Sequence, residues 1–368
     1  MEPEPPFQKL YNTIFIKETS KEEEESSKTL AVVEECELPL IDLSRLLSRS
    51  AIDREECKRD IAEASKQWGF FQVVNHGISR EILERMHDEQ VKVFRQPFDK
   101  KNKEKLLNLS ADSYRWGTPN ATTLKQFSWS EAFHIPLTDI SSSVGEFNTL
   151  RSCRQSWPTV DVTCSHVGMR LTIEEFATTV SNLAQNIAEI LAENLGHKTT
   201  FFAENCLPNT CYLRLNRYPS CPISSEVFGL MPHTDSDFLT ILYQDQVGGL
   251  QLVKDGRWIM VKPNPEALII NIGDLFQAWS NDVYKSVEHR VMTNRRVERF
   301  SVAYFFCPSY ETVIQSCRKP SVYREFSFRE FRRQVQEDVG RFGYKVGLPR
   351  FGKEEGDGLG KHSKMLQI

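Results

Sequence analysis

The sequence predicts an α+β protein in which helices lead into a β-sandwich or jelly roll. Residues 53–67 and 79–95 carry apolar positions at helical spacing, and a longer helix is indicated around 176–195. From Cys211 onward, short alternating segments are separated by turn residues. Short strands at this regular spacing are typical of a sandwich or jelly roll rather than of a parallel α/β sheet.

The first part of the chain is expected to hold a tail, two strands and two helices. Residues 1–37 include four consecutive glutamates and are expected to form a solvated, disordered tail. A short strand is expected at 38–43. The helix at 53–67 leads into an aromatic and β-branched run at 68–74 that indicates a second strand, and the helix at 79–95 follows.

A central helix separates this part from the strand-rich part. Its apolar residues recur at spacings of three and four, and Gly196 follows as a C-terminal cap. The apolar positions are Phe176, Val180, Leu183, Ile187, Ile190, Leu191 and Leu195. The strands expected after it are 211–218, 228–234, 238–244, 249–253, 257–262, 267–272, 284–291 and 299–307. The sequence therefore divides into an N-terminal helical and strand region at 38–200, a core at 201–345 and a loose tail at 346–368.

Composition excludes several classes of function. The 368 residues carry a net charge of −4 without a basic stripe, so nucleic acid is not expected as a partner. No apolar run approaches the roughly 20 residues that span a bilayer. The nine cysteines include no Cys-x-x-Cys pair, and no signal peptide is recognised. We therefore expect reduced thiols and a cytoplasmic or nuclear location. The oligomeric state is left open.

Two histidines and one aspartate form a candidate metal site. His233 and Asp235 are two positions apart, and His289 follows fifty-four positions after the aspartate. This ligand set is the facial triad of non-haem Fe(II) oxygenases, which leaves coordination positions open. A lone His-x-Asp is more often a pair of surface residues, and the same triad could hold catalytic zinc in a hydrolase.

Further polar pairs at strand period two favour the oxygenase over the zinc hydrolase. Arg299 and Ser301 share one face of a predicted strand, as Asn216 and Tyr218 share another. An α-keto acid can chelate a metal through its C1 carboxylate and keto oxygen. The distal carboxylate of 2-oxoglutarate then suits the planar fork of Arg299, with Ser301 adding a hydroxyl. A hydrolase would leave both residues without a role.

Several motifs resemble those of the plant 2-oxoglutarate- and Fe(II)-dependent dioxygenases. They are the segment 68–78, the segment 216–222, His233-Thr-Asp235, His289-Arg-Val and Arg299-Phe-Ser301. The resemblance covers about 38–345, and its one noted departure is Pro-Ser-Cys in place of Pro-Pro-Cys. It implies a double-stranded β-helix (jelly-roll) core braced by N-terminal and central helices. It also implies bound Fe(II), 2-oxoglutarate contacted by Tyr218 and Asn216, O2 as co-substrate, and ascorbate to keep the iron reduced.

The segment 114–137 resembles gibberellin 2-oxidases of the group acting on twenty-carbon gibberellins. This implies 2β-hydroxylation of a diterpenoid acid, with succinate and CO2 as co-products. An apolar substrate pocket is expected. Its candidate residues are Tyr114, Trp116, Phe127, Trp129, Phe305, Phe306 and Tyr310, with Arg115 or Lys125 meeting the acid group.

Three other functions stay open. The enzyme could oxidise gibberellin at another carbon or oxidise a flavonoid. From a different class, a binding protein could have kept the fold and lost catalysis, although such a protein would be expected to lose a ligand or the arginine. His233, Asp235, His289, Arg299 and Ser301 are all present, which argues against this last alternative.

Overall fold

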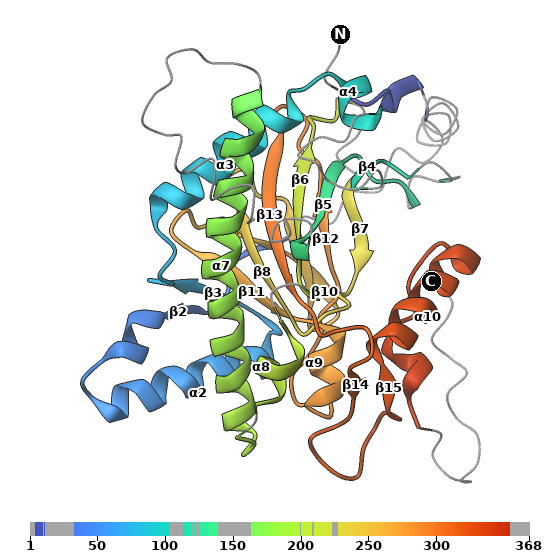
Figure 1. Cartoon of the computed structure of the whole chain (residues 1–368). Helices are drawn as coiled ribbons and strands as arrows, with labels where there is room; N and C mark the ends of the chain where they lie inside the picture. The colour runs from blue at the N-terminus through green and yellow to red at the C-terminus, as the bar shows by residue number, and fades with distance from the viewer. Residues whose placement is uncertain are drawn as a thin grey trace.

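The computed structural model shows two β-sheets packed face to face with helices around them (Figure 1). It describes residues 4–9, 11, 33–103, 113–118, 121, 126–138, 163–198, 200–207, 210–222 and 227–353, and only the backbone of residues 163–167. The expected α+β jelly roll is confirmed by this architecture.

The larger sheet supplies one wall of the core. Its strands are β2 (Leu40–Asp42), β3 (Phe70–Val74), β4 (Tyr114–Trp116), β5 (Glu131–Pro136), β6 (Tyr212–Tyr218), β8 (Leu239–Gln244), β11 (Leu268–Ile272) and β13 (Arg299–Phe306). Within the described residues their order is β2-β3-β11-β8-β13-β6-β5-β4. The first four strands come from the region 38–200 and the others from 201–345, so both regions build one sheet.

The smaller sheet supplies the opposite wall. Its strands are β1 (Glu35–Cys36), β7 (Phe228–His233), β9 (Leu250–Lys254), β10 (Arg257–Val261) and β12 (His289–Met292). In the part of the chain that the structure describes, they are ordered β1-β10-β9-β12-β7. A separate hairpin joins β14 (Val313–Ile314) to β15 (Phe326–Ser327).

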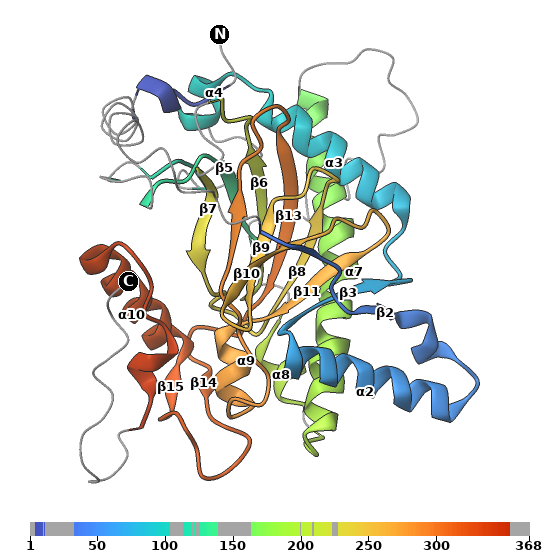
Figure 2. The same ribbon diagram turned by 180° about the vertical axis from the view of Figure 1, so that it is seen from behind.

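Helices lie around the two sheets. They are η1 (Leu43–Leu47), α2 (Ala51–Gln67), α3 (Arg80–Phe94), α4 (Phe98–Lys103), α7 (Thr163–Asn194), α8 (Phe201–Asn205), α9 (Asp274–Trp279), α10 (Phe328–Phe342) and η5 (Leu348–Phe351). The long α7 packs against β8 and β13, and α2 and α3 pack against α7 (Figures 1 and 2). No helix that the structure describes combines the length and hydropathy needed to cross a membrane.

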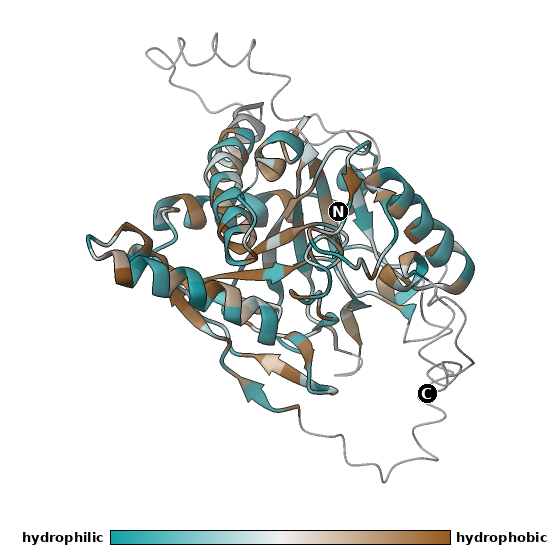
Figure 3. Ribbon diagram, turned by 90° about the horizontal axis from the view of Figure 1, so that it is seen from below, coloured by the Kyte–Doolittle hydropathy of each residue, from teal (hydrophilic) through white to brown (hydrophobic). Residues whose placement is uncertain are grey.

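Local sequence signals start and stop these helices. Ser50, Ser79 and Ser327 each accept a backbone hydrogen bond in the first turn of α2, α3 and α10. Gly343 ends α10 with φ of 80°, a left-handed conformation that glycine adopts without strain. In Figure 3 the peripheral helices carry both teal hydrophilic and brown hydrophobic residues, as expected of helices that cover a core with one face.

Strand alternation gives the larger sheet two functions. Leu213 and Leu215 of β6 and Val302 of β13 are fully buried in the main core, which also contains the apolar stripe of α7. The alternate residues of β6 and β13 face the space between the sheets instead. One face therefore stabilises the fold, and the other lines a cavity.

Two expectations about the termini need correction. Within the expected tail 1–37, Phe7 and Tyr11 are buried in a cluster with Phe127 and Trp129, and β1 pairs with β10. The charged run on which the expectation depended lies outside the described residues. In the expected tail 346–368, η5 is ordered and buries Leu348 and Phe351, while 354–368 lie outside the described residues.

Other differences concern secondary structure. The strand expected at 284–291 is shorter and later, because only His289–Met292 pairs with neighbouring strands. The sequence did not predict β4, β5, α9 or α10. The helix α9 has an unusual start, since Gly273 precedes it and a Cβ there would meet Asp237 Oδ1 at 2.1 Å.

Candidate active site

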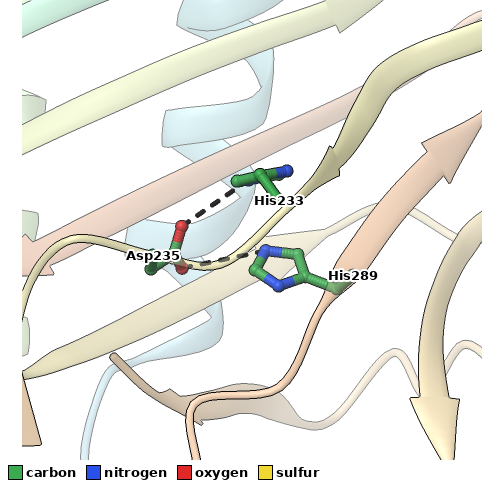
Figure 4. Close-up of side chains that lie close together, drawn as sticks. All are labelled: His233, Asp235 and His289. Carbon is green, nitrogen blue, oxygen red and sulfur yellow. Dashed lines mark ion pairs between the residues drawn. The ribbon is translucent and has the colours of Figure 1, made fainter. Parts of the chain in front are cut away.

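Two neighbouring strands bring the candidate metal ligands together. His233 ends β7, His289 begins β12, and the two residues are directly paired between these antiparallel strands. Asp235 follows β7 in a loop and reaches between them (Figure 4). The Nε2 atom of His233 lies 3.6 Å from Asp235 Oδ1, and that of His289 lies 3.8 Å from Asp235 Oδ2. Ligand atoms of all three lie within 4.8 Å of one another, which suits one divalent ion.

Backbone contacts orient both imidazole rings. His233 Nδ1 lies 2.7 Å from the carbonyl of Met231, and His289 Nδ1 lies 3.1 Å from that of Val287. Because a carbonyl can only accept, each Nδ1 carries the proton and each Nε2 presents its lone pair to the centre. Burial, with His289 nearby, lowers the pKa of His233, so this ring is neutral and able to coordinate at neutral pH.

Two buried polar side chains hold the carboxylate. Thr240 Oγ1 and Asn271 Nδ2 donate to Asp235 Oδ2 at 2.6 and 2.8 Å. Burial by itself raises the pKa of Asp235, but His289, His233 and these two hydrogen bonds outweigh it and leave the pKa below its usual value. The carboxylate is therefore ionised, as a metal ligand must be.

A second carboxyl, Asp237, lies behind the triad. Its Oδ2 is 2.9 Å from Thr240 Oγ1, and burial together with the charge of Asp235 raises its pKa well above the usual value. A hydroxyl has one hydrogen, which Thr240 gives to Asp235. A protonated Asp237 then supplies the hydrogen in the second contact.

A cation lies in the strands beside the triad. The antiparallel pairing of β13 with β6 sets Arg299 opposite Tyr218 and Ser301 opposite Asn216. Arg299 is 2% exposed, bonds Gln244 Oε1 at 2.7 Å and lies 4.9 Å above the Tyr218 ring. It makes no ion pair with any described residue, and its Nε has no partner there. A buried, uncompensated guanidinium favours an anionic ligand, as the distal carboxylate of 2-oxoglutarate would be.

A helix residue that the sequence did not reveal fixes this pair of strands. Gln90 of α3 is 1% exposed, and its Nε2 donates to the carbonyls of Asn216 and Ser301 at 3.0 and 2.9 Å. The amide of Asn216 lies 3.4 Å from Ser301 Oγ. Gln90 thus fixes the register of β6 against β13 at the candidate co-substrate site, from the outer face of the sheet.

The triad and the cation open into one cavity of about 360 Å³ between the two sheets. The predicted residues that line it are Asn216, Tyr218, His233, Asp235, His289, Arg299, Ser301 and Phe305. The structure adds Arg214, Arg332 and Lys345, among others. Of these three residues, only Arg214 could have been predicted from the sequence to line the cavity, because it continues the period-two series of Asn216 and Tyr218.

The other candidate pocket residues lie elsewhere. The side chain of Phe306 points to the opposite face of β13 from that of Phe305, and it is buried in the core near Phe202. Tyr310 is 52% exposed and stacks on Phe328. Neither residue lines the cavity.

The aromatic residues of the 114–137 segment also differ from expectation. Phe127, Trp129 and Trp116 pack in the cluster that holds Phe7. The hydroxyl of Tyr114 is bonded to the buried carboxylate of Glu131. These contacts are core packing, not cavity lining.

Two cations were expected to meet the acid group of the substrate. Arg115 is exposed on β4, and Lys125 lies outside the described residues.

Comparison with known proteins identifies the class of the site. A model of the 2OG-Fe(II) oxygenase superfamily matches residues 209–308, and one of the non-haem dioxygenase N-terminal region in morphine synthesis matches residues 38–159. The chain belongs to the 2OG-Fe(II) oxygenases, and it is a dioxygenase that uses Fe(II) and 2-oxoglutarate.

Individual relatives narrow the comparison. The chain is 60% identical to Gibberellin 2-beta-dioxygenase 8 of Arabidopsis thaliana over 95% of this chain and 98% of the relative. It is 49% identical to Gibberellin 2-beta-dioxygenase 6 of Oryza sativa subsp. japonica, over 87% and 86%. Among solved structures, JOX2 in complex with 2OG, Fe and JA is 33% identical with a TM-score of 0.65, covering 83% of this chain and 86% of JOX2.

Proposed function

We propose that this protein is a gibberellin 2β-dioxygenase, which hydroxylates and so inactivates gibberellins. The observation that carries this proposal is the high identity, over nearly the whole chain, to relatives with that name. A preference for twenty-carbon gibberellins is a finer proposal, supported by the resemblance of the segment 114–137.

The reaction consumes one O2 and one 2-oxoglutarate for each substrate C–H bond. One oxygen atom enters the hydroxyl group and the other enters succinate, with loss of CO2. When bound, Fe(II) supplies the activation of O2 that couples these two oxidations. Substrate position then decides which carbon reacts.

We assign roles to the residues of the cavity on this basis. His233, Asp235 and His289 hold Fe(II), with Thr240 and Asn271 orienting the carboxylate. The distal carboxylate of 2-oxoglutarate binds Arg299 and Ser301, with Tyr218 and Asn216 on the facing strand.

A product assay tests the proposal. The purified protein is incubated with Fe(II), ascorbate, 2-oxoglutarate and a panel of twenty- and nineteen-carbon gibberellins, and products are identified by mass spectrometry. We expect 2β-hydroxylated products, formed faster from twenty-carbon substrates, with matching succinate. Oxidation at C-3 or C-20 only, or turnover of flavonoids alone, would reject the assignment and leave the dioxygenase class intact. Binding of gibberellin without any succinate release would favour a protein that has lost catalysis.

We also propose a cytoplasmic or nuclear location. Cys206, Cys211 and Cys307 are buried close together as free thiols, as in a reducing compartment. Imaging of a fluorescently tagged full-length chain tests this, and a signal confined to a secretory compartment would contradict it.

A further inference from the structure

The cavity has a second cationic end, separate from Arg299. Tyr218, Asn216, Arg214 and Tyr212 follow one another along the cavity face of β6. Same-face neighbours on a strand are roughly 6.6 Å apart. Arg214 therefore begins about 13 Å along the strand from Tyr218, whose cross-strand partner is Arg299. A co-substrate carboxylate at Arg299 leaves Arg214 free for another ligand.

Arg332 comes from α10 and also lines the cavity. Its charge acts on His134 and Tyr212, the neighbours of Arg214, which puts it at the same end. Both arginine side chains are half-buried, and neither has a hydrogen bond or ion pair with any residue that the structure describes.

Lys345 is a contrast within the same lining. Its Nζ forms an ion pair with Asp274 at 2.6 Å and donates a hydrogen bond to the carbonyl of Thr234 at 2.8 Å. The positive charge of Lys345 is therefore already neutralised within the protein.

The surroundings of Arg214 leave room for an anionic group beside an apolar body. On β13, the residue opposite Arg214 is Ala303, whose short side chain lines the same cavity. The next pair along the strands is Tyr212 and Phe305, whose rings stack at 4.5 Å. A small residue and an aromatic wall thus flank the two cations.

The third basic side chain at this end is His134 of β5, opposite Arg214. Burial, followed by the positive charges of Arg214 and Arg332, lowers the pKa of His134 to about 4. The imidazole is therefore neutral at neutral pH, and the positive charge at this end resides on the two arginines.

We infer that Arg214 and Arg332 form a carboxylate subsite that binds the acid group of the substrate at the end of the cavity away from Arg299. The assignment of that acid to a gibberellin rests on the proposed function. Anchoring the acid at this end limits which carbons of a rigid substrate can approach the His233–Asp235–His289 site, so the pair are specificity-determining residues.

Binding to the complete but unreactive enzyme tests this inference. The full-length protein is loaded anaerobically with Fe(II) and 2-oxoglutarate, and a twenty-carbon gibberellin is titrated by calorimetry as the free acid and as its methyl ester. The wild type should bind the acid more tightly. In Arg214→Gln and in Arg332→Gln, Kd for the acid should rise about 10- to 100-fold, the range for one hydrogen bond to a charged group. Kd for the ester should change little, which a merely structural role would not produce.

Matched variants provide the controls. Arg333 follows Arg332 on α10, but its side chain is 80% exposed and pairs with Glu337. Arg333→Gln should therefore leave both Kd values unchanged. Arg214→Lys should recover part of the preference for the acid, because it keeps the charge. The 2-oxoglutarate Kd should stay within about twofold in every variant, since Arg299 is untouched.

Each outcome decides between the two proposals. Loss of acid preference in both glutamine variants supports the subsite. A wild type without acid preference, unchanged acid binding in both variants, or equal loss for acid and ester would overturn it. If both glutamine variants lose the acid preference but the wild type hydroxylates no gibberellin when O2 is admitted, the proposed function fails and the subsite stands.

Discussion

The hydrogen bond from Thr240 to Asp235, the carboxylate that we propose as a metal ligand, gives a prediction that depends only on the tertiary structure. Thr240 and Asn271 are the two side chains that donate to Asp235 Oδ2. Thr240→Val replaces the hydroxyl by a methyl group of similar size. It therefore removes one donor from a buried carboxylate that is 6% exposed, and Asn271 retains the other.

The expected loss follows from the charge on the acceptor. A hydrogen bond to a charged group contributes about 1.5–3 kcal/mol. At about 1.4 kcal/mol per decade, Fe(II) affinity should fall roughly 10- to 100-fold. This is also the range found when residues behind metal ligands are replaced.

Anaerobic calorimetric titration with Fe(II), in the presence of 2-oxoglutarate, measures this loss. Thr240→Ser is the matched control, because it keeps the hydroxyl and removes only the methyl group. Thermal unfolding without metal shows whether each variant is folded. A folded Thr240→Val protein with wild-type Fe(II) affinity would refute the reasoning, as would an equal loss of affinity in Thr240→Ser.

Three further changes test other parts of the site. His289→Ala should leave the protein folded but without bound iron or succinate release, and metal analysis with near-normal iron would show that the triad is wrongly assigned. Arg299→Lys keeps the charge but loses the planar fork, so KM for 2-oxoglutarate should rise about 10- to 100-fold while KM for gibberellin changes little. An equal KM for 2-oxoglutarate in the wild type and the variant would exclude Arg299 as the residue that binds the distal carboxylate. Gly273→Ala would set a Cβ 2.1 Å from Asp237 Oδ1 and 2.2 Å from its carbonyl oxygen, so unfolding free energy should fall by about 1–3 kcal/mol, and an unchanged Tm would contradict the close packing.

Strand period two explains which candidate residues can be placed from the sequence alone. Residues i and i+2 of a strand share a face, so Arg299 groups with Ser301, and Asn216 groups with Tyr218. The same rule separates Phe305 from Phe306, and it leads from Asn216 back to Arg214. The error at Phe306 therefore came from incomplete use of a signal that the sequence contains.

The aromatic residues of the 114–137 segment show where such reasoning fails. Trp116, Phe127 and Trp129 are apolar enough for a substrate pocket, and nothing in their spacing tells a pocket from a core. In the structure they pack with Phe7, more than a hundred residues earlier in the chain. Their burial is decided by a long-range contact, which composition does not encode.

The jelly roll, the candidate ligand set and the pairing of Arg299 with Ser301 follow from the amino-acid sequence. Regularly spaced short strands predict the fold, residue types predict the ligand set, and alternation along a strand fixes side-chain direction over a few residues. Packing in three dimensions was needed to bring Gln90 behind the strands, Thr240 and Asn271 onto Asp235, and Arg332 of α10 to the cavity beside Arg214. These residues come from distant segments. Which of them meet depends on how whole helices and sheets pack to bury their apolar faces, and that free energy is shared by the entire core.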